Sequence, residues 1–154
     1  MTLKLLKTNW IQAPDSSRIW ISFPLVYTGF IQVLTGFPKP HLLRDRDFHH
    51  FLIMMSEEIF DYPFWMQDLS HFPLFFIFAW LWAWFFTRLN RNSFALYFAA
   101  IVSVSFAIIN ELIQFFIPDR FPSAGDILMN LLGVTIALVV HSYCRKTISS
   151  HHRL

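Results

Sequence analysis

The sequence predicts an all-α membrane protein, a bundle of four helices that each cross the bilayer. Of the 154 residues, 55% are hydrophobic and only 14% are charged, whereas about a quarter of a soluble domain is charged. Segments without acidic or basic side chains cover residues 19–38, 72–87, 92–110 and 127–144. Each approaches the roughly 20 residues that a helix needs to cross a bilayer. We therefore expect one integral membrane domain over residues 1–154.

These segments give each helix its expected limits. The predicted spans are residues 19–38, 70–87, 94–117 and 126–143. The first contains Pro24, and neighbouring helices can satisfy the backbone groups that a proline frees. The second is short, but the aliphatic stem of Arg88 can lengthen it while its charge stays at the interface. Pro118 ends the third, and the fourth begins near Asp126.

The connecting segments are predicted from their length and pattern. Apolar residues recur at helical spacing from Phe48 to Ile59, which predicts a short amphipathic helix on the membrane surface. The loop at residues 88–92 is tight, so the second and third helices should be antiparallel neighbours. Residues 4–18 contain no apolar run before a cleavage site, so the first helix should be an uncleaved insertion signal.

Lys and Arg side chains predict the orientation of the bundle. Of the 12, eight lie in the N-terminal segment, the loop after the second helix and the C-terminal tail. These three segments share one side in a four-span protein. Because cytoplasmic loops are enriched in Lys and Arg, we expect both termini in the cytoplasm. The loop that contains Arg120 should then face the outside.

A concentration of polar residues interrupts the apolar sequence between residues 110 and 133. Ionisable groups at membrane depth are costly, and they usually have a partner or a function. Glu111 and Gln114 are three residues apart and share one face of a helix. Arg120 follows in the loop, where its planar fork can pair with Glu111 or Asp126. This combination is a candidate binding site for a polar or anionic group.

The fourth helix carries a polar and small-residue stripe. Asp126, Asn130, Gly133, Ala137 and His141 lie on one face of it. The spacing of Gly133 and Ala137 permits close approach of another helix, so this face should look inward, toward the third helix. Asn130 could then have no role beyond forming an interhelical hydrogen bond. His141 is expected at the inner membrane interface.

Two residues at the start of the second helix complete the predicted pocket. Asp68 and His71 are three residues apart and share a face if the helix has begun by then. In an up-down bundle this end meets the end of the third helix and the start of the fourth. The candidate ligand-binding residues are Asp68, His71, Glu111, Gln114, Arg120, Asp126 and Asn130.

The same side chains also have a purely structural interpretation. Asp126 could stabilise the dipole of the helix that it begins. Arg120 could serve only to neutralise Glu111, although a buried ion pair is rarely an effective source of stability. His71 could be an interfacial histidine paired with Asp68.

Several classes of partner are excluded by composition. The single cysteine, Cys144, allows no intramolecular disulfide and no cysteine-based metal site. The histidines of the first loop, near Asp45 and Asp47, match no standard ligand spacing, so we expect no metal and no cofactor. The formal charge of +2 is scattered, which argues against a nucleic-acid partner.

The polar positions resemble the signature of VanZ-like membrane proteins. They read Glu111-x-x-Gln114, Pro118-x-Arg120, Ser123, Asp126-Ile127, Asn130 and Gly133. Residues 68–72 are similar to the Asp-Lys-x-x-His element that precedes the family's second span, with Leu69 in place of the Lys. The resemblance implies a small multi-pass protein of the bacterial cytoplasmic membrane. Founding members of that family are linked to low-level resistance to the glycopeptide teicoplanin.

Three functions remain open on the sequence. The preferred one is a non-enzymatic protein that binds an anionic membrane lipid or a lipid-linked cell-wall precursor at its outer face, with Arg120 as the anion fork. The second is a membrane enzyme acting on a lipid phosphate, with Glu111 or His71 as general base. It is disfavoured because no activated Ser or Cys nucleophile is evident. The third is a small lipid transporter or flippase subunit, which would have to form a homo-oligomer.

Overall fold

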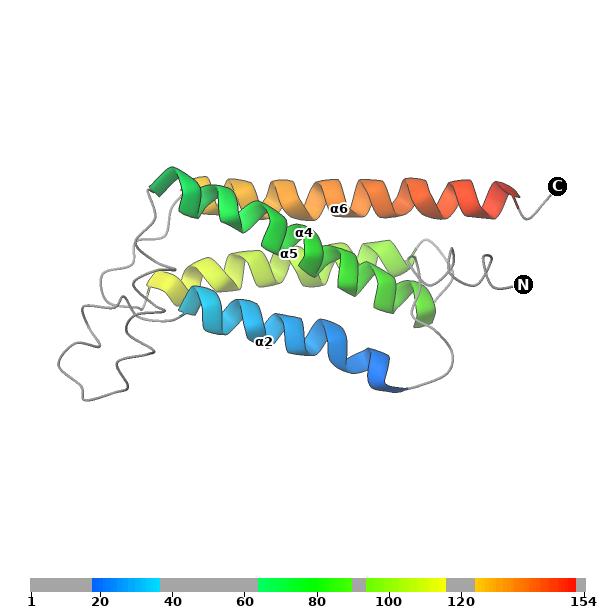
Figure 1. Ribbon diagram of the computed structural model, residues 1–154, viewed down its shortest axis with the longest axis horizontal. Coiled ribbons are helices and arrows are strands. Elements are labelled where there is room, and N and C mark those ends of the chain that lie inside the picture. The colour runs from blue at the N-terminus through cyan, green and yellow to red at the C-terminus, as the bar shows by residue number, and fades with distance from the viewer. Residues whose placement is uncertain (1–17, 37–63, 90–93, 116–123, 152–154) are drawn as a thin grey trace.

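The structure is a computed structural model, and it describes residues 18–36, 64–89, 94–115 and 124–151. These residues form one short 3-10 helix, η1 (Arg18–Ile21), and four α-helices (Figure 1). The α-helices are α2 (Ser22–Gly36), α4 (Phe64–Leu89), α5 (Phe94–Phe115) and α6 (Ala124–His151). The expected amphipathic helix from Phe48 to Ile59 lies outside the described residues.

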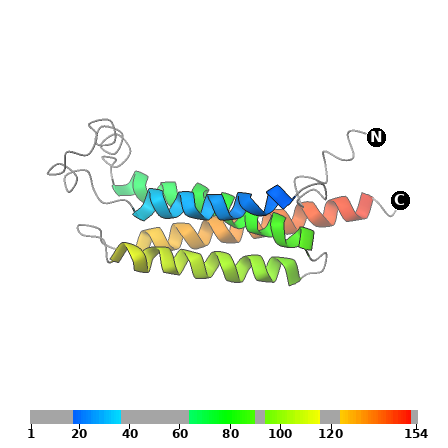
Figure 2. The same cartoon turned by 90° about the horizontal axis from the view of Figure 1, so that it is seen from below.

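Successive helices run in opposite directions along the bundle. The end of α2, the start of α4, the end of α5 and the start of α6 gather at one end of the molecule, on the left in Figure 1. Figure 2 shows the same alternation from below. This arrangement agrees with the expected up-down order, and it brings the polar sequence regions of four helices to the same end.

Three of the helices are long and apolar enough to cross a membrane. The candidate spans are Leu69–Leu89, Phe94–Gln114 and Ala124–Thr147. In contrast, α2 has 15 residues and is about 22 Å long at the usual rise per residue, which is shorter than a hydrocarbon core of about 30 Å. Among the described residues, length and composition therefore give three candidate spans where the sequence predicts four.

Two helices continue through polar sequence beyond their predicted limits. α4 begins at Phe64, directly after Pro63, rather than at residue 70. α6 continues to His151 instead of ending at residue 143. The extension contains Arg145 and Lys146, which are good helix formers. Loss of hydrophobicity marks the edge of a membrane segment, but it does not end a helix.

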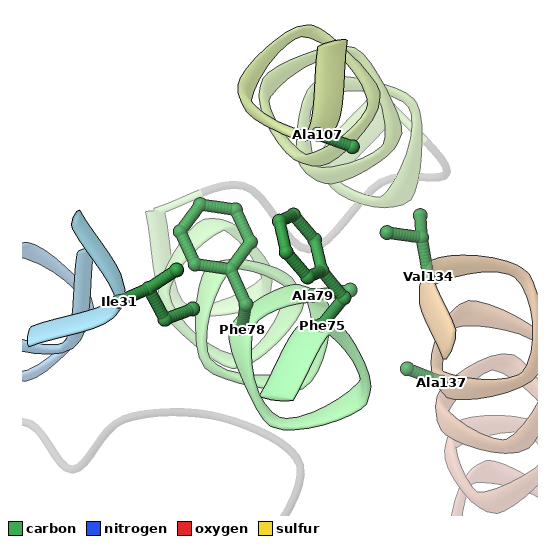
Figure 3. Close-up of a cluster of buried hydrophobic side chains, with 7 residues drawn as sticks. All are labelled: Ile31, Phe75, Phe78, Ala79, Ala107, Val134 and Ala137. Atoms are coloured by element: carbon green, nitrogen blue, oxygen red, sulfur yellow. The ribbon is translucent and has the colours of Figure 1, made fainter. Parts of the chain in front are cut away.

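An apolar core joins the four α-helices. Its buried residues are Ile31, Phe75, Phe78, Ala79, Ala107, Val134 and Ala137 (Figure 3). Phe78 stacks on Phe106 with ring centroids 4.6 Å apart. Because lipid is as apolar as these side chains, close packing rather than water exclusion stabilises their association. α4 lies in the centre and packs against α2, α5 and α6.

Gly133 sets the close approach of α6 to α4. A Cβ atom at this position would lie 3.0 Å from the backbone nitrogen of Phe76 and closer still to the carbonyl oxygen of Phe72. Ala137, one turn later, is fully buried. Gly133 therefore permits the close helix approach that the sequence predicts. The helix that approaches it is α4, however, and not α5. The approach places the start of α6 beside His71.

Candidate functional site

Seven buried polar side chains from all four α-helices gather at the end of the bundle where α6 begins. We call this group the polar site. Its members are Thr35, His71, Asn110, Glu111, Gln114, Asp126 and Asn130. None is more than 8% exposed. Burial of so many hydrogen-bonding groups is unfavourable unless each group has a hydrogen-bond partner.

Glu111 is the centre of the polar site. Its Oε1 accepts a hydrogen bond from Asn130 Nδ2 at 3.0 Å and a longer one from Asn110 Nδ2 at 3.4 Å. Its Oε2 is buried and has no hydrogen-bond partner among the described residues. Glu111 is four residues before the last residue of α5, Phe115, or about 6 Å along the helix axis.

The two asparagines fix the polarity of the network. Asn130 Nδ2 donates to Glu111, so Asn130 Oδ1 is the acceptor that lies 3.0 Å from His71 Nδ1. This network assigns the proton to Nδ1 of His71. Asn110 is arranged in the same way, because its amide nitrogen faces Glu111 and its Oδ1 accepts from Thr35 Oγ1 at 2.6 Å.

His71 lies between two carboxyl groups. Its Nδ1 is 3.8 Å from Glu111 Oε1, and its Nε2 is 3.7 Å from Asp126 Oδ1. Asp126 is in the first turn of α6, where the helix dipole stabilises a negative charge. One imidazole therefore faces two acids, and the described part of the site has more acidic than basic groups.

Thr35 is the contribution of α2 to the polar site. Its Oγ1 is within donating distance of both Asn110 Oδ1, at 2.6 Å, and the Ile31 carbonyl oxygen, at 2.8 Å. Its place in the site is not predicted by the sequence. A threonine in an apolar helix ordinarily bonds the carbonyl of its own preceding turn, as Thr28 bonds the Pro24 carbonyl, so no sequence signal separates Thr35 from Thr28.

Gln114 lies one turn beyond Glu111 on α5 and is 3% exposed. Its Nε2 has no hydrogen-bond partner among the described residues. On α5, the polar site thus holds a buried acceptor, Glu111 Oε2, and a buried donor, Gln114 Nε2, that have no hydrogen-bond partner among the described residues. Each such atom costs about 1–3 kcal/mol of desolvation free energy.

The structure brings five of the seven predicted site residues together: His71, Glu111, Gln114, Asp126 and Asn130. Asp68 belongs to α4, but its side chain lies outside the described residues, as does the whole of Arg120. Their part in the site stays a prediction. Within the described ranges, no group of three or more His, Cys, Asp and Glu side chains is arranged to hold a metal ion.

His141 is fully buried inside the bundle. Its ring and that of Trp80 form a T-shaped pair with centroids 5.0 Å apart. This burial agrees with the place of His141 on the inward stripe of α6, while its position at the inner membrane interface stays a prediction.

Comparison with protein families agrees with the pattern of residues in the polar site. The VanZ/LLP1 family model matches residues 19–145. The chain belongs to the VanZ/LLP1 family. This VanZ/LLP1 match includes every member of the polar site, together with the three candidate membrane spans up to residue 145. No curated protein and no solved structure matches the chain.

Proposed function

We propose that this VanZ/LLP1-family membrane protein binds the headgroup of an envelope lipid, or of a lipid-linked cell-wall precursor, in the polar site. The observation that carries the proposal is that two buried atoms of α5 in the polar site, Glu111 Oε2 and Gln114 Nε2, have no hydrogen-bond partner among the described residues. Such atoms are rare in native structures and need an explanation. A headgroup with a donor and an acceptor would satisfy both.

The surroundings of the polar site favour an amphiphile over a small water-soluble ligand. Leu69, Leu112 and Leu128 are close in sequence to His71, Glu111 and Asp126, respectively, and are more than half exposed. In a bilayer these leucines would face acyl chains, while the headgroup reached the polar residues. Arg120 would bind the phosphate with its planar fork.

The proposal includes the topology and place of the protein. The bundle would cross the bacterial cytoplasmic membrane four times, with α2 as the first span and both termini in the cytoplasm. The polar site would then open toward the outer leaflet, where finished lipids and wall precursors are presented. Binding there would change the presentation of wall precursors and lower the effect of teicoplanin.

A second candidate function is supported by the position of His71 between Glu111 and Asp126. A histidine with a carboxylate neighbour can act as a general base. The protein would then catalyse a reaction on a lipid phosphate. Release of product from lipid phosphates by the purified protein would favour this function over binding alone.

The proposed function is tested by measuring the lipids that purify with the protein. We expect Gln114→Leu and Arg120→Ala to lower the amount of retained lipid about tenfold, since each removes a polar contact worth about 1.4 kcal/mol or more. Thr135→Val is the matched control, because Thr135 is exposed and, among the described residues, its hydroxyl bonds the Leu131 carbonyl of its own helix. Equal lipid retention by all four proteins would contradict the proposal.

The same variants test the resistance phenotype. In a teicoplanin-susceptible bacterium, expression of the wild type should raise the minimum inhibitory concentration, and Arg120→Ala at equal abundance should not. If Arg120→Ala protects as well as the wild type does, the anion fork has no part in the function.

A further inference from the structure

We infer that the group bound beside Glu111 is a primary ammonium carried next to a phosphate, as in an ethanolamine headgroup. This inference rests on the proposed headgroup function and names the chemistry that the polar site would select. It follows from the polarity of the hydrogen bonds, from the balance of charge and from the position of Gln114.

The hydrogen bonds leave Glu111 as an acceptor. Both asparagine amides point their nitrogen atoms at Glu111 Oε1, and both amide oxygens already accept from Thr35 or His71. Neither asparagine can reverse its amide without placing its oxygen against the oxygen of the Glu111 carboxyl group. The buried Oε2 is therefore available to accept a hydrogen bond from a ligand.

The charges of the polar site favour a cation at this position. Among the described residues of the polar site, Glu111 and Asp126 supply two carboxyl groups, and His71 supplies at most one positive charge. A phosphate placed against Glu111 Oε2 would be repelled, because like charges are destabilising at short range and low dielectric. A cationic N–H donor would be attracted and would form a charge-assisted hydrogen bond.

Gln114 supplies the complementary half of the arrangement. Its unsatisfied Nε2 is a donor, and it is displaced from Glu111 by three residues toward the end of α5, or about 4.5 Å along the axis. An ethanolamine phosphate carries its ammonium and its phosphate oxygens a short distance apart. The ammonium would reach Glu111 and the phosphate would accept from Gln114, nearer the end of the bundle.

Two other common headgroups fit less well. A choline nitrogen is cationic but has no N–H to donate to Oε2, and none of the seven side chains of the polar site is Trp, Tyr or Phe, the rings that favour a quaternary ammonium. A glycerol headgroup donates hydrogen bonds but brings no positive charge. The polar site should therefore retain ethanolamine lipids over both.

The test uses the full chain in phosphatidylcholine nanodiscs that contain a minor fraction of phosphatidylethanolamine or of phosphatidylglycerol. Native mass spectrometry then counts the lipid that each protein retains. We expect the wild type to retain phosphatidylethanolamine about tenfold over either other lipid, the effect of one charge-assisted hydrogen bond. Glu111→Gln should abolish this preference, because it preserves an oxygen for the two asparagines and turns the free acceptor into a donor.

The controls separate this inference from the proposed function. Gln114→Leu should weaken retention of phosphatidylethanolamine and phosphatidylglycerol alike, and Thr135→Val should change neither. A preference for phosphatidylglycerol that Glu111→Gln leaves intact would overturn the ammonium while supporting the headgroup function. If the protein retained neither lipid more strongly than phosphatidylcholine, both the ammonium inference and the proposed headgroup function would be overturned.

A soluble competitor distinguishes a lipid from a free amine as the source of the group. Phosphoethanolamine should displace phosphatidylethanolamine from the wild type, and phosphocholine at the same concentration should not. Equal displacement by both compounds would show that the N–H donors are not recognised. Asp126→Asn provides a second variant, and it should reduce the same preference if Glu111→Gln fails to fold.

Discussion

Asn130 on α6 donates a 3.0 Å hydrogen bond to the buried carboxyl group of Glu111 on α5. The same amide accepts from His71 on α4. One side chain thus joins three helices at the depth where water is scarce. Each partner is a residue that could bind a headgroup, so the geometry of the polar site depends on Asn130.

Replacement of Asn130 by leucine should destabilise the protein. The change removes one donor from Glu111 and one acceptor from His71, and it leaves both groups buried. We expect a loss of about 1–3 kcal/mol in the free energy of unfolding, measured by denaturation in detergent. Thr135→Val should stay within about 0.5 kcal/mol of the wild type. If Asn130→Leu changed the free energy of unfolding by as little as Thr135→Val, the network would contribute nothing to stability.

A methyl group added at Gly133 should separate α4 from α6. The new Cβ would meet the backbone of Phe72 and Phe76, which cannot move without displacing α4. We expect Gly133→Ala to lower the free energy of unfolding by about 1–3 kcal/mol. Gly29→Ala is the matched control, because a Cβ at Gly29 meets nothing within 4 Å. Equal stability of the two variants would contradict the close approach.

Thr35→Val should weaken the attachment of α2 to the polar site. The variant keeps the shape of the side chain but leaves Asn110 Oδ1 without its 2.6 Å donor. We expect a loss of about 1–3 kcal/mol in stability and lower retention of lipid. Thr28→Val is the control, since within the described ranges the hydroxyl of Thr28 bonds the Pro24 carbonyl of its own helix. The link would be refuted if the two variants unfolded at the same temperature.

The proposed orientation predicts the activity of reporter fusions. Alkaline phosphatase is active only outside the cytoplasm, so a fusion after Gly125 should be active and a fusion after Leu89 should be inactive. These positions lie at the start of α6 and at the end of α4, at opposite ends of the bundle. The reverse pattern would place the polar site at the cytoplasmic side.

The long helices could be predicted from the sequence because membrane segments must be both apolar and helical. Charge-free segments locate α4, α5 and α6 well, but they misplace the start of α4 and the end of α6. Those limits depend on backbone propensity outside the lipid, which hydropathy does not report. For α2, the charge-free segment is longer than the helix of 15 residues.

Much of the polar site could also be predicted, because ionisable residues in an apolar sequence are conspicuous. His71, Glu111 and Asp126 were selected on that ground, and the up-down order explains why they meet. Thr35 and the pairing role of Asn110 depend on how α2 packs beside α5. Packing of that kind is a property of the assembled bundle, and no single segment reports it.

The most direct test of the headgroup function is an experimental structure of the protein with its native lipids retained. We predict headgroup atoms within hydrogen-bonding distance of Glu111 Oε2 and Gln114 Nε2, two buried atoms of α5 that have no hydrogen-bond partner among the described residues. If Arg120 instead folded back to pair with Glu111 Oε2 and no lipid headgroup lay beside Gln114, the polar site would be a structural ion pair and the proposed function would be wrong.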